Sequence, residues 1–241
     1  MQKRAQVTVF ILLGLVIAIL IFLSFYFFGS KLTQQDKTPL DRTQLIPLQQ
    51  HIENCMQVSL EKSFDALKSN AFYSSTSAHY TEYGGANINY LIYPENSQNK
   101  LPSLQGIQDV IASQLVQDMK TCALSKFKLN IKEDKSNIKA SAAISDSKII
   151  LTLNYPIKIT KGKTTLQLQD FSITKDTDLG LIHTTISEII SGELSGEFDQ
   201  YQYSLTHPEA VIDKFNLNMN NALFLVTSNK GEDYVLFAIK K

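Results

Sequence analysis

The sequence predicts an α+β fold: one N-terminal transmembrane helix, followed by an extracytoplasmic domain in which amphipathic helices pack on an antiparallel sheet. Three patterns along the 241 residues predict this fold. An uninterrupted apolar run occupies residues 7–28, and apolar residues recur every three or four positions in two later stretches. Several stretches after Phe127 alternate between apolar and polar residues, as strands do.

The apolar run from Val7 to Phe28 has the length of a membrane span. It contains no charged side chain, and as a helix it would extend about 33 Å, which is enough to cross a bilayer. Lys3 and Arg4 precede the run, and no acidic residue does. We therefore expect residues 1–6 in the cytoplasm and residues 29–241 outside the membrane.

The part of the chain expected outside the membrane divides into a tether and one domain. Residues 29–45 are mostly polar and contain Pro39, so we expect a short tether before a domain at residues 46–241. This exterior part carries 21 basic and 23 acidic residues. Such a balance favours neither a nucleic acid nor an anionic lipid surface as a partner.

Two cysteines, Cys55 and Cys122, lie 67 positions apart. An even number of cysteines in an oxidising compartment predicts one disulfide, which would stabilise the fold by about 4 kcal/mol. Two separate buried thiols are one alternative. A metal site is the other, because His51 lies four residues before Cys55 on the same helix face, although no second pair of ligands has a comparable spacing.

Apolar residues at helical spacing predict the first two helices of the domain. One runs from Ile46 to Leu67 with Pro47 in its first turn. The other opens at Pro102 and Ser103 and ends near Cys122. Each cysteine falls on the apolar stripe of its helix.

Tyrosines are concentrated between these two helices. Gly84 and Gly85 predict a turn between two short strands in this region. The tyrosines around that turn are Tyr73, Tyr80, Tyr83, Tyr90 and Tyr93. Because tyrosine combines apolar area with a polar hydroxyl, we interpret the group as a candidate contact surface, with core and strand-edge positions as the alternative.

Period-two patterning predicts a meander of four antiparallel strands in the middle of the chain. The strands are residues 128–133, 137–144, 149–160 and 164–174. Pro156 lies on the polar face of the third strand, which predicts an edge strand or a bulge there.

The C-terminal third predicts a further helix after residues 176–178, broken near Gly192 or Gly196. Residues 198–205 fit a helix and a strand equally well. Pro208 and Glu209 then predict a short helical turn.

A closing hairpin is predicted at the end of the chain, from residues 222–228 and 234–239.

No combination of residue types predicts a catalytic site with a specific spacing. The four histidines, His51, His79, His183 and His207, are spread over unlike elements. Asp178, His183 and Ser187 have the residue types of a hydrolytic triad, but they share one helical segment without a G-x-S-x-G sequence.

Acidic residues offer two weaker hypotheses. Asp176, Asp178 and Gly180 resemble the opening of a calcium loop, but the later ligands are missing, and a helix N-cap explains them more simply. Glu193, Glu197 and Asp199 could supply paired carboxylates for glycan hydrolysis, with a solvated acidic face as the alternative. We predict no catalytic residue, no metal and no cofactor.

The N-terminal sequence KRAQVTVFI, residues 3–11, resembles the class III signal peptide of archaeal type IV pilin-like proteins. In that family a short basic leader is cleaved before a glutamine, and the apolar helix remains to anchor the subunit or to pack into a filament. The resemblance implies processing between Ala5 and Gln6. Phe10 replaces the usual acidic residue and Pro39 interrupts the long helix of a pilin, so an anchored surface domain is implied rather than a filament subunit.

The remainder is similar to uncharacterised single-pass envelope proteins of small-genome archaea. The residues that carry this similarity are Glu53 to Cys55, Leu101 to Leu104 with the run to Cys122 and Phe127, and Tyr234 to Ile239. The similarity implies an archaeal cell envelope and no particular activity.

We therefore expect a membrane-anchored archaeal cell-surface protein with a structural or protein-interaction role, as in pilin-like and envelope components. Its expected partners are the lipid bilayer, through Val7 to Phe28, and unidentified proteins at the cell surface, but no nucleic acid. Two alternatives remain: a membrane-anchored envelope hydrolase that uses carboxylates, and an accessory ligand-binding subunit of a membrane complex.

Overall fold

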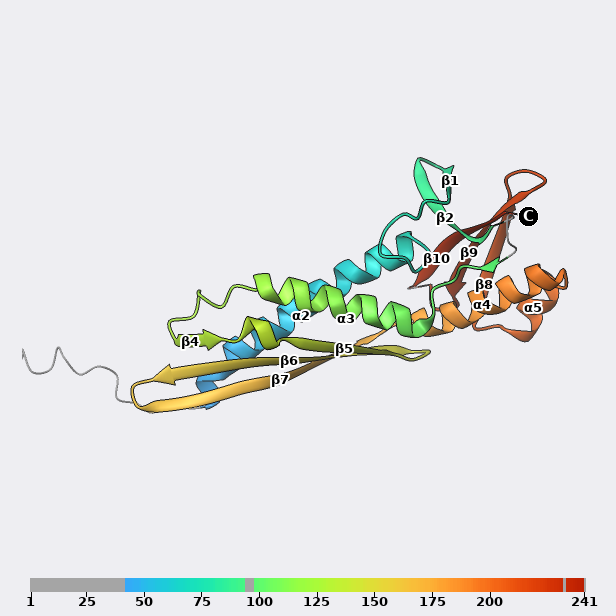
Figure 1. Ribbon diagram of the computed structural model, residues 1–241. Helices are drawn as coiled ribbons and strands as arrows, with labels where there is room; N and C mark the ends of the chain where they lie inside the picture. Colours follow the sequence, from blue (N-terminus) through green and yellow to red (C-terminus); the bar gives the residue numbers. More distant parts are fainter. Residues whose placement is uncertain (1–41, 94–97, 232, 241) are drawn as a thin grey trace, which may run out of the picture. The chain divides into compact units, whose positions relative to one another are not determined.

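The computed structural model describes residues 42–93, 98–231 and 233–240, which form four α-helices, two 3₁₀ turns and ten strands in two sheets (Figure 1). Residues 42–160 and 165–240 belong to one compact unit, and the turn at residues 161–164 lies outside it. The apolar run at residues 7–28 and the processing site expected at Ala5 and Gln6 lie outside the described residues.

Two amphipathic helices, α2 (Ile46–Ser69) and α3 (Leu104–Thr121), are confirmed close to their predicted bounds. The 3₁₀ turn η1 (Arg42–Leu45) leads directly into α2, so the end of the predicted tether is already folded. Ser103 caps α3, because its Oγ accepts a hydrogen bond from the Gly106 N–H at 3.1 Å. The helices bury Leu48, Ile52, Met56, Leu60, Phe64 and Leu67 from α2 and Ile107, Ile111, Leu115 and Met119 from α3.

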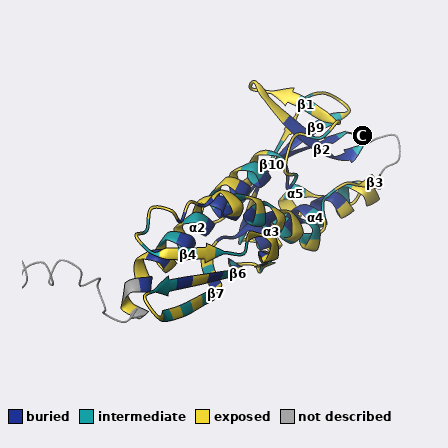
Figure 2. Ribbon diagram, turned by 60° about the vertical axis from the view of Figure 1, so that its left-hand side comes forward, coloured by how far each residue is buried: buried dark blue, intermediate teal, exposed yellow. Residues whose placement is uncertain are grey.

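The first sheet contains β4 (Asn130–Glu133), β5 (Lys139–Ile144), β6 (Lys148–Lys161) and β7 (Thr164–Asp176), and β6 pairs with the other three. Buried and more exposed residues alternate along β6, as its banding in Figure 2 shows. The buried side chains are Ile149, Leu151, Leu153, Tyr155, Ile157 and Ile159. The predicted alternation of this strand is confirmed, and α3 packs against its neighbour β5.

The strand order differs from the predicted meander. β4 pairs with residues 157–160 of β6 and β5 pairs with residues 149–154, so both strands lie beside β6 and not beside each other. Pro156 falls between these two stretches and has no N–H to donate, and opposite it the chain forms the 3₁₀ turn η2 (Lys135–Asn137). The predicted meander is therefore right for β5, β6 and β7 and wrong for β4, which pairs with β6 instead of β5. Pro156 coincides with an interruption of the neighbouring chain rather than with an edge strand.

The second sheet has the order β1 (Tyr80–Tyr83), β2 (Ala86–Tyr93), β10 (Tyr234–Lys240), β9 (Asn221–Ser228) and β8 (Ala210–Asn216), and β3 (Gln98–Asn99) also pairs with β2. Two predicted hairpins are confirmed here. β1 and β2 turn at Gly84 and Gly85, which both have positive φ, and β9 and β10 form the closing hairpin. β10 runs antiparallel to β9 but parallel to β2, so the sheet is mixed.

The predicted fold class needs correction on two points. The described residues form an α+β structure, but with two sheets instead of one, and the second sheet contains a parallel pair. None of the helices in residues 42–93, 98–231 and 233–240 combines the length and the apolar composition that crossing a bilayer requires. The sequence could not show the parallel pair, because β2 and β10 lie near opposite ends of the domain, and their mostly continuous apolar runs fit any strand that is buried on both faces.

One face of the second sheet is covered by α4 (Leu179–Ser195), which packs against β8, β9 and β10. A Cβ at Gly180 would lie 2.4 Å from the Ser145 carbonyl oxygen, so only glycine allows the helix to lie this close to the turn between β5 and β6. The helix ends at Gly196 with φ 75°, which is one of the two predicted positions. The contact buries Ile182, Ile186, Ile189 and Ile190 from the helix and Phe224, Val226, Val235 and Phe237 from the sheet.

Residues 198–205, where helix and strand fitted equally, are mostly helical: α5 runs from Gln200 to Thr206. The sequence predicted a helical turn at Pro208 and Glu209 but missed the strand β8 that follows. Gln200 Nε2 donates to the Ile212 carbonyl oxygen at 2.7 Å, so α5 occupies part of the free edge of β8.

Candidate functional site

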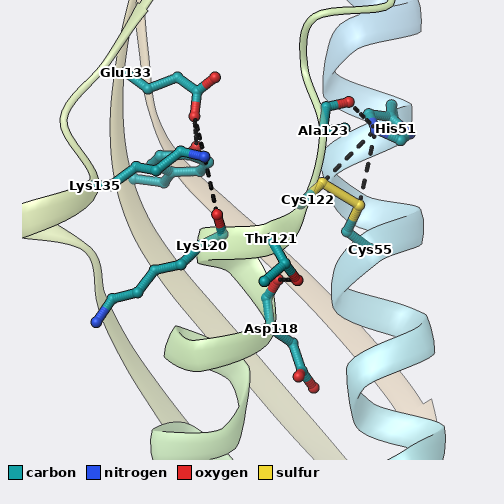
Figure 3. Close-up of a disulfide and its surroundings, with 10 residues drawn as sticks. His51, Cys55, Asp118, Lys120, Thr121, Cys122, Ala123, Glu133 and Lys135 are labelled. Atoms are coloured by element: carbon teal, nitrogen blue, oxygen red, sulfur yellow. Dashed lines mark hydrogen bonds and ion pairs between the residues drawn. A yellow bond between two sulfur atoms is a disulfide. The ribbon is translucent and has the colours of Figure 1, made fainter.

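The two cysteines and His51 lie together where α2 meets the end of α3 (Figure 3). The sulfur atoms of Cys55 and Cys122 are 2.15 Å apart, at bonding distance, and the two Cα atoms are 6.2 Å apart. The disulfide ties α2 to Cys122, the residue directly after the end of α3, across a sequence separation of 67. The structure therefore has a disulfide where separate thiols and a metal site were the alternatives.

His51 is held beside this disulfide by a main-chain contact. Its Nε2 lies 3.0 Å from the Ala123 carbonyl oxygen, 3.7 Å from Cys122 Sγ and 3.9 Å from Cys55 Sγ. Because a carbonyl oxygen only accepts, Nε2 carries the proton and donates it. Zinc would need the lone pair of that nitrogen and two thiolates, so the three residues do not fit a metal site in this state.

Asp178 and Asp233 meet at the N-terminus of α4, where the sequence suggested a cap or a calcium loop. The Asp178 side chain does not cap the helix, because its Oδ1 accepts from Lys230 Nζ at 2.9 Å. Thr177 Oγ1 accepts from the N–H of Leu179, the first residue of α4, at 3.2 Å. Asp233, far along the chain, completes this cap: its Oδ2 accepts from Thr177 Oγ1 at 2.6 Å and from the Asp178 N–H at 3.0 Å. The carboxylates of Asp178 and Asp233 both have basic partners, since Lys230 binds the first and Lys68 Nζ lies 3.5 Å from Asp233 Oδ1. Asp178 is thus the N-cap residue at the predicted position, but the cap is made by Thr177 and by Asp233, which sequence reasoning missed.

The residues considered as a hydrolytic triad, Asp178, His183 and Ser187, do not form one. His183 Nε2 lies 2.9 Å from the Pro102 carbonyl oxygen and its ring packs edge-on against Phe72, while Asp178 is engaged by Lys230. His79 stacks on Tyr93 with ring centroids 4.2 Å apart. These histidines therefore have structural partners, and neither faces a carboxylate within hydrogen-bond reach.

A polar cluster does form between α4 and α5, around a hollow of about 420 Å³. The Tyr203 hydroxyl donates to Glu188 Oε2, and the same oxygen lies 3.9 Å from His207 Nε2. The His207 ring stacks on Tyr203 with centroids 4.0 Å apart and an interplanar angle of 12°. This stacking and hydrogen bonding hold α5 on α4.

The three carboxylates considered for hydrolysis are divided by the fold. The Glu193 side chain is 3% exposed and accepts from Lys214 Nζ at 2.6 Å. Asp199 caps α5, because its Oδ1 accepts from the Gln202 N–H at 3.0 Å. Only Glu197 and Asp199 line the hollow together with Glu188, so the hollow contains two of the three predicted residues.

Two tyrosines in the described unit have a pKa raised far above that of free tyrosine. For Tyr155, burial is the main cause, and its 2.6 Å hydrogen bond to the Glu133 carboxylate raises the pKa further. For Tyr203, burial again comes first and the hydrogen bond to Glu188 adds to it. Both phenols are therefore held in the neutral form.

These raised pKa values predict alkaline sensitivity. An unfolded tyrosine ionises near pH 10, so the stability that the neutral phenols contribute is complete below about pH 10 and is lost as the pH rises towards the folded-state pKa. We expect the free energy of unfolding, measured by urea denaturation across this range, to fall with pH. The fall should be smaller in a Tyr155→Phe/Tyr203→Phe variant than in a Tyr80→Phe/Tyr83→Phe control, and an equal fall in both would contradict the assignment.

The predicted tyrosine surface is not continuous. Tyr90 is buried, and the Tyr73 hydroxyl donates to the Lys100 carbonyl oxygen. Tyr93 is partly buried between His79, Tyr90 and Lys240 Nζ. Only Tyr80 and Tyr83 are well exposed, and three positions apart on β1 they point to opposite sides of the strand. Core and edge positions therefore account for most of the group.

A larger apolar surface lies on the face of the second sheet opposite α4. The strand registers place three rows of side chains there: Phe215, Leu223, Ala238 and Tyr90; Asp213, Leu225 and Leu236; Val211, Thr227 and Tyr234. We call this set the apolar face. Its three outer members, Val211, Phe215 and Tyr234, are 48%, 47% and 50% exposed.

The apolar face departs from the usual composition of such a sheet. When helices cover one face of a sheet, the other face normally alternates to polar residues in contact with water. Here Asp213 and Thr227 are the polar members of the three rows, and the next pair in the register, Asn221 and Lys240, is polar and borders them. The sequence signal was present in β9 and β10, whose residues are mostly apolar at both alternating positions, but without β8 it predicted only the closing hairpin.

No protein-family model matches the chain, and neither the curated proteins nor the solved structures include a match.

Proposed function

We propose that the chain is a membrane-attached cell-surface protein whose described domain binds another protein through the apolar face. The observation that carries the proposal is the half-exposed trio Val211, Phe215 and Tyr234 on a sheet face with few polar residues. Asp213 separates Val211 from Phe215, and Thr227 separates Val211 from Tyr234, so the three exposed side chains share one face of the sheet. Exposed apolar side chains gathered on one face mark many interaction sites. The N-terminal resemblance and the apolar run at residues 7–28 support the membrane attachment and the cell-surface location.

The composition of the apolar face suits a surface that is in contact with water when no partner is bound. Leu223 and Ala238 in its middle are already buried by the domain itself, so a partner would touch the exposed Val211, Phe215 and Tyr234, with Asp213 and Thr227 between them. Such a mixture of apolar and polar area is usual for interfaces between proteins that also exist separately. Tyr234 and Phe215 are the residue types from which interface anchors are often built.

The hydrolase alternative is less well supported. The hollow beside α5 contains Glu188, Glu197 and Asp199, but Asp199 caps a helix and Glu188 accepts from Tyr203. Acid–base catalysis needs carboxyl groups free to exchange protons with a substrate. A structural role explains these contacts without a reaction.

Site-specific photocross-linking tests the interaction. Benzoylphenylalanine would replace Phe215 or Tyr234 in the full chain expressed in its native membrane, and Thr152 on the exposed side of β6 would serve as the matched control. We expect a discrete cross-linked product from the first two positions and none from the third. Absence of products at positions 215 and 234, or the same products at all three positions, would refute the proposal.

A further inference from the structure

The near-zero net charge of the chain conceals a separation of charge within the described unit. Residues 188–214 contain six acidic side chains and one lysine, and they form the end of α4, α5 and β8. By contrast, four exposed lysines lie on or near β4, and we call these the lysine patch: Lys126, Lys128, Lys132 and Lys158. Excluding an anionic partner from net charge alone was therefore not justified.

The contacts of the lysine patch place it near the first turns of α2. Lys126 Nζ lies 5.5 Å from the centre of the Phe127 ring, which is 5.5 Å from the His51 ring of α2. Lys132 and Lys158 are directly opposite each other in the β4–β6 pair. Lys128 comes two residues before Asn130, which pairs with Thr160. Figures 1 and 2 both show β4 beside the beginning of α2, at the end of β6.

The described residues leave the lysine patch poorly neutralised. Glu133, the acidic residue next to Lys132, accepts from Tyr155 and lies 3.1 Å from Lys135 Nζ, so its charge is already matched. Like charges on directly opposite residues of a strand pair are destabilising. The Lys132 and Lys158 pair is thus an unfavourable arrangement that a bound anion would make favourable.

We propose that the lysine patch binds the anionic headgroups of the membrane to which the chain is attached. This inference rests on the proposed attachment through residues 7–28. The thirteen residues between that run and η1 can span at most about 45 Å, which limits how far the start of α2 can move from the bilayer. A tether of this length lets the lysine patch reach the leaflet, and basic side chains that come within a Debye length of about 8 Å of negatively charged headgroups are attracted to them.

The position of the patch beside α2 leaves the rest of the unit free of the membrane. The lysines of β4 and β6 would contact the headgroups. Residues 188–214 and the apolar face belong to other elements and carry no such basic surface. The acidic segment would be repelled by the same headgroups. Electrostatic contact therefore orients the domain as well as holding it.

Lysine acetylation in reconstituted vesicles tests this contact. The full chain would be placed in vesicles of phosphatidylcholine alone and of phosphatidylcholine mixed with phosphatidylglycerol, and the acetylation rate of each lysine measured by mass spectrometry. We expect the lysine patch to react several-fold more slowly in the anionic vesicles, and the protection to disappear in high salt. Lys148, exposed on the same strand about 33 Å from Lys158, is the matched control and should react equally in both.

Charge-reversal variants provide a second test of the contact between the lysine patch and the headgroups. A Lys132→Glu/Lys158→Glu variant should lose the protection at Lys126 and Lys128, whereas Lys148→Glu should keep it. Inorganic phosphate added to neutral vesicles should not reproduce the protection; if it does, the patch binds free phosphate and the headgroup proposal is overturned. Protection that is equal in neutral vesicles and grows with protein density would overturn it in favour of a second copy of the chain.

Vesicle flotation in high salt separates this inference from the proposed function. A chain that remains with neutral vesicles but shows no lipid-dependent protection is attached and lacks the lysine contact. A chain that leaves neutral vesicles but binds anionic vesicles in low salt, with the lysine patch protected, has the contact and lacks the attachment.

Discussion

Replacing both cysteines, in a Cys55→Ala/Cys122→Ala variant, is expected to lower the free energy of unfolding by about 4 kcal/mol. The disulfide closes a loop that contains β1, β2, β3 and α3, so without it the unfolded chain gains the freedom of all these residues. Cys122 is also buried, so a small further loss follows from the cavity. Urea denaturation of the two proteins under oxidising conditions measures the difference.

Reductant separates the effect of the bond from that of the side chains. Dithiothreitol should bring the wild-type protein close to the stability of the double variant and leave the variant unchanged. A His51→Ala variant is the matched control, because it removes the neighbouring ring and keeps the bond. If reduced and oxidised wild-type protein unfold at the same urea concentration, the disulfide contributes nothing to stability.

Substituting Asp233→Ala is expected to cost about 3 kcal/mol, because it removes a helix cap and breaks a buried ion pair. The carboxylate accepts from Thr177 Oγ1 and the Asp178 N–H and lies 3.5 Å from Lys68 Nζ. Without it, the first turn of α4 has an unsatisfied buried N–H and Lys68 has no partner carboxylate at this position. Thermal or urea unfolding would give the loss.

Two further variants determine which contact matters. Asp213→Ala removes an exposed carboxylate from β8 and should change the free energy of unfolding by less than about 0.5 kcal/mol. Asp233→Asn keeps an acceptor for the cap but loses the charge, so an intermediate cost is expected. A loss in Asp233→Ala no larger than that in Asp213→Ala would show that the cap at α4 is unimportant.

The helices and hairpins were predictable because local patterns determine them. Apolar spacing located α2 and α3, and Gly84, Gly85 and Gly196 marked the correct turns. Strand partners were harder, since a long strand such as β6 can accept two short neighbours along one edge and its sequence does not say so. β8 was missed because Asp213 and Lys214 interrupt its apolar alternation.

The candidate sites were less predictable than the fold. Pairing of Cys55 with Cys122 follows from their number and from their places on two apolar stripes. The cap of α4 by Asp233 joins residues 55 positions apart, and no local signal reveals such a contact. The apolar face depends on the registers of three strands together, whereas the tyrosines that attracted notice are mostly buried or bonded to the main chain.

The parallel pairing of β2 with β10 has a consequence for how the chain folds. β10 is the last of the described strands, yet it lies in the middle of the second sheet, between β2 and β9. During synthesis β2 emerges early and has only β1 and β3 as neighbours until β10 has emerged. Pairings between such distant segments form slowly, so we expect the second sheet to assemble last, after the first sheet and its helices.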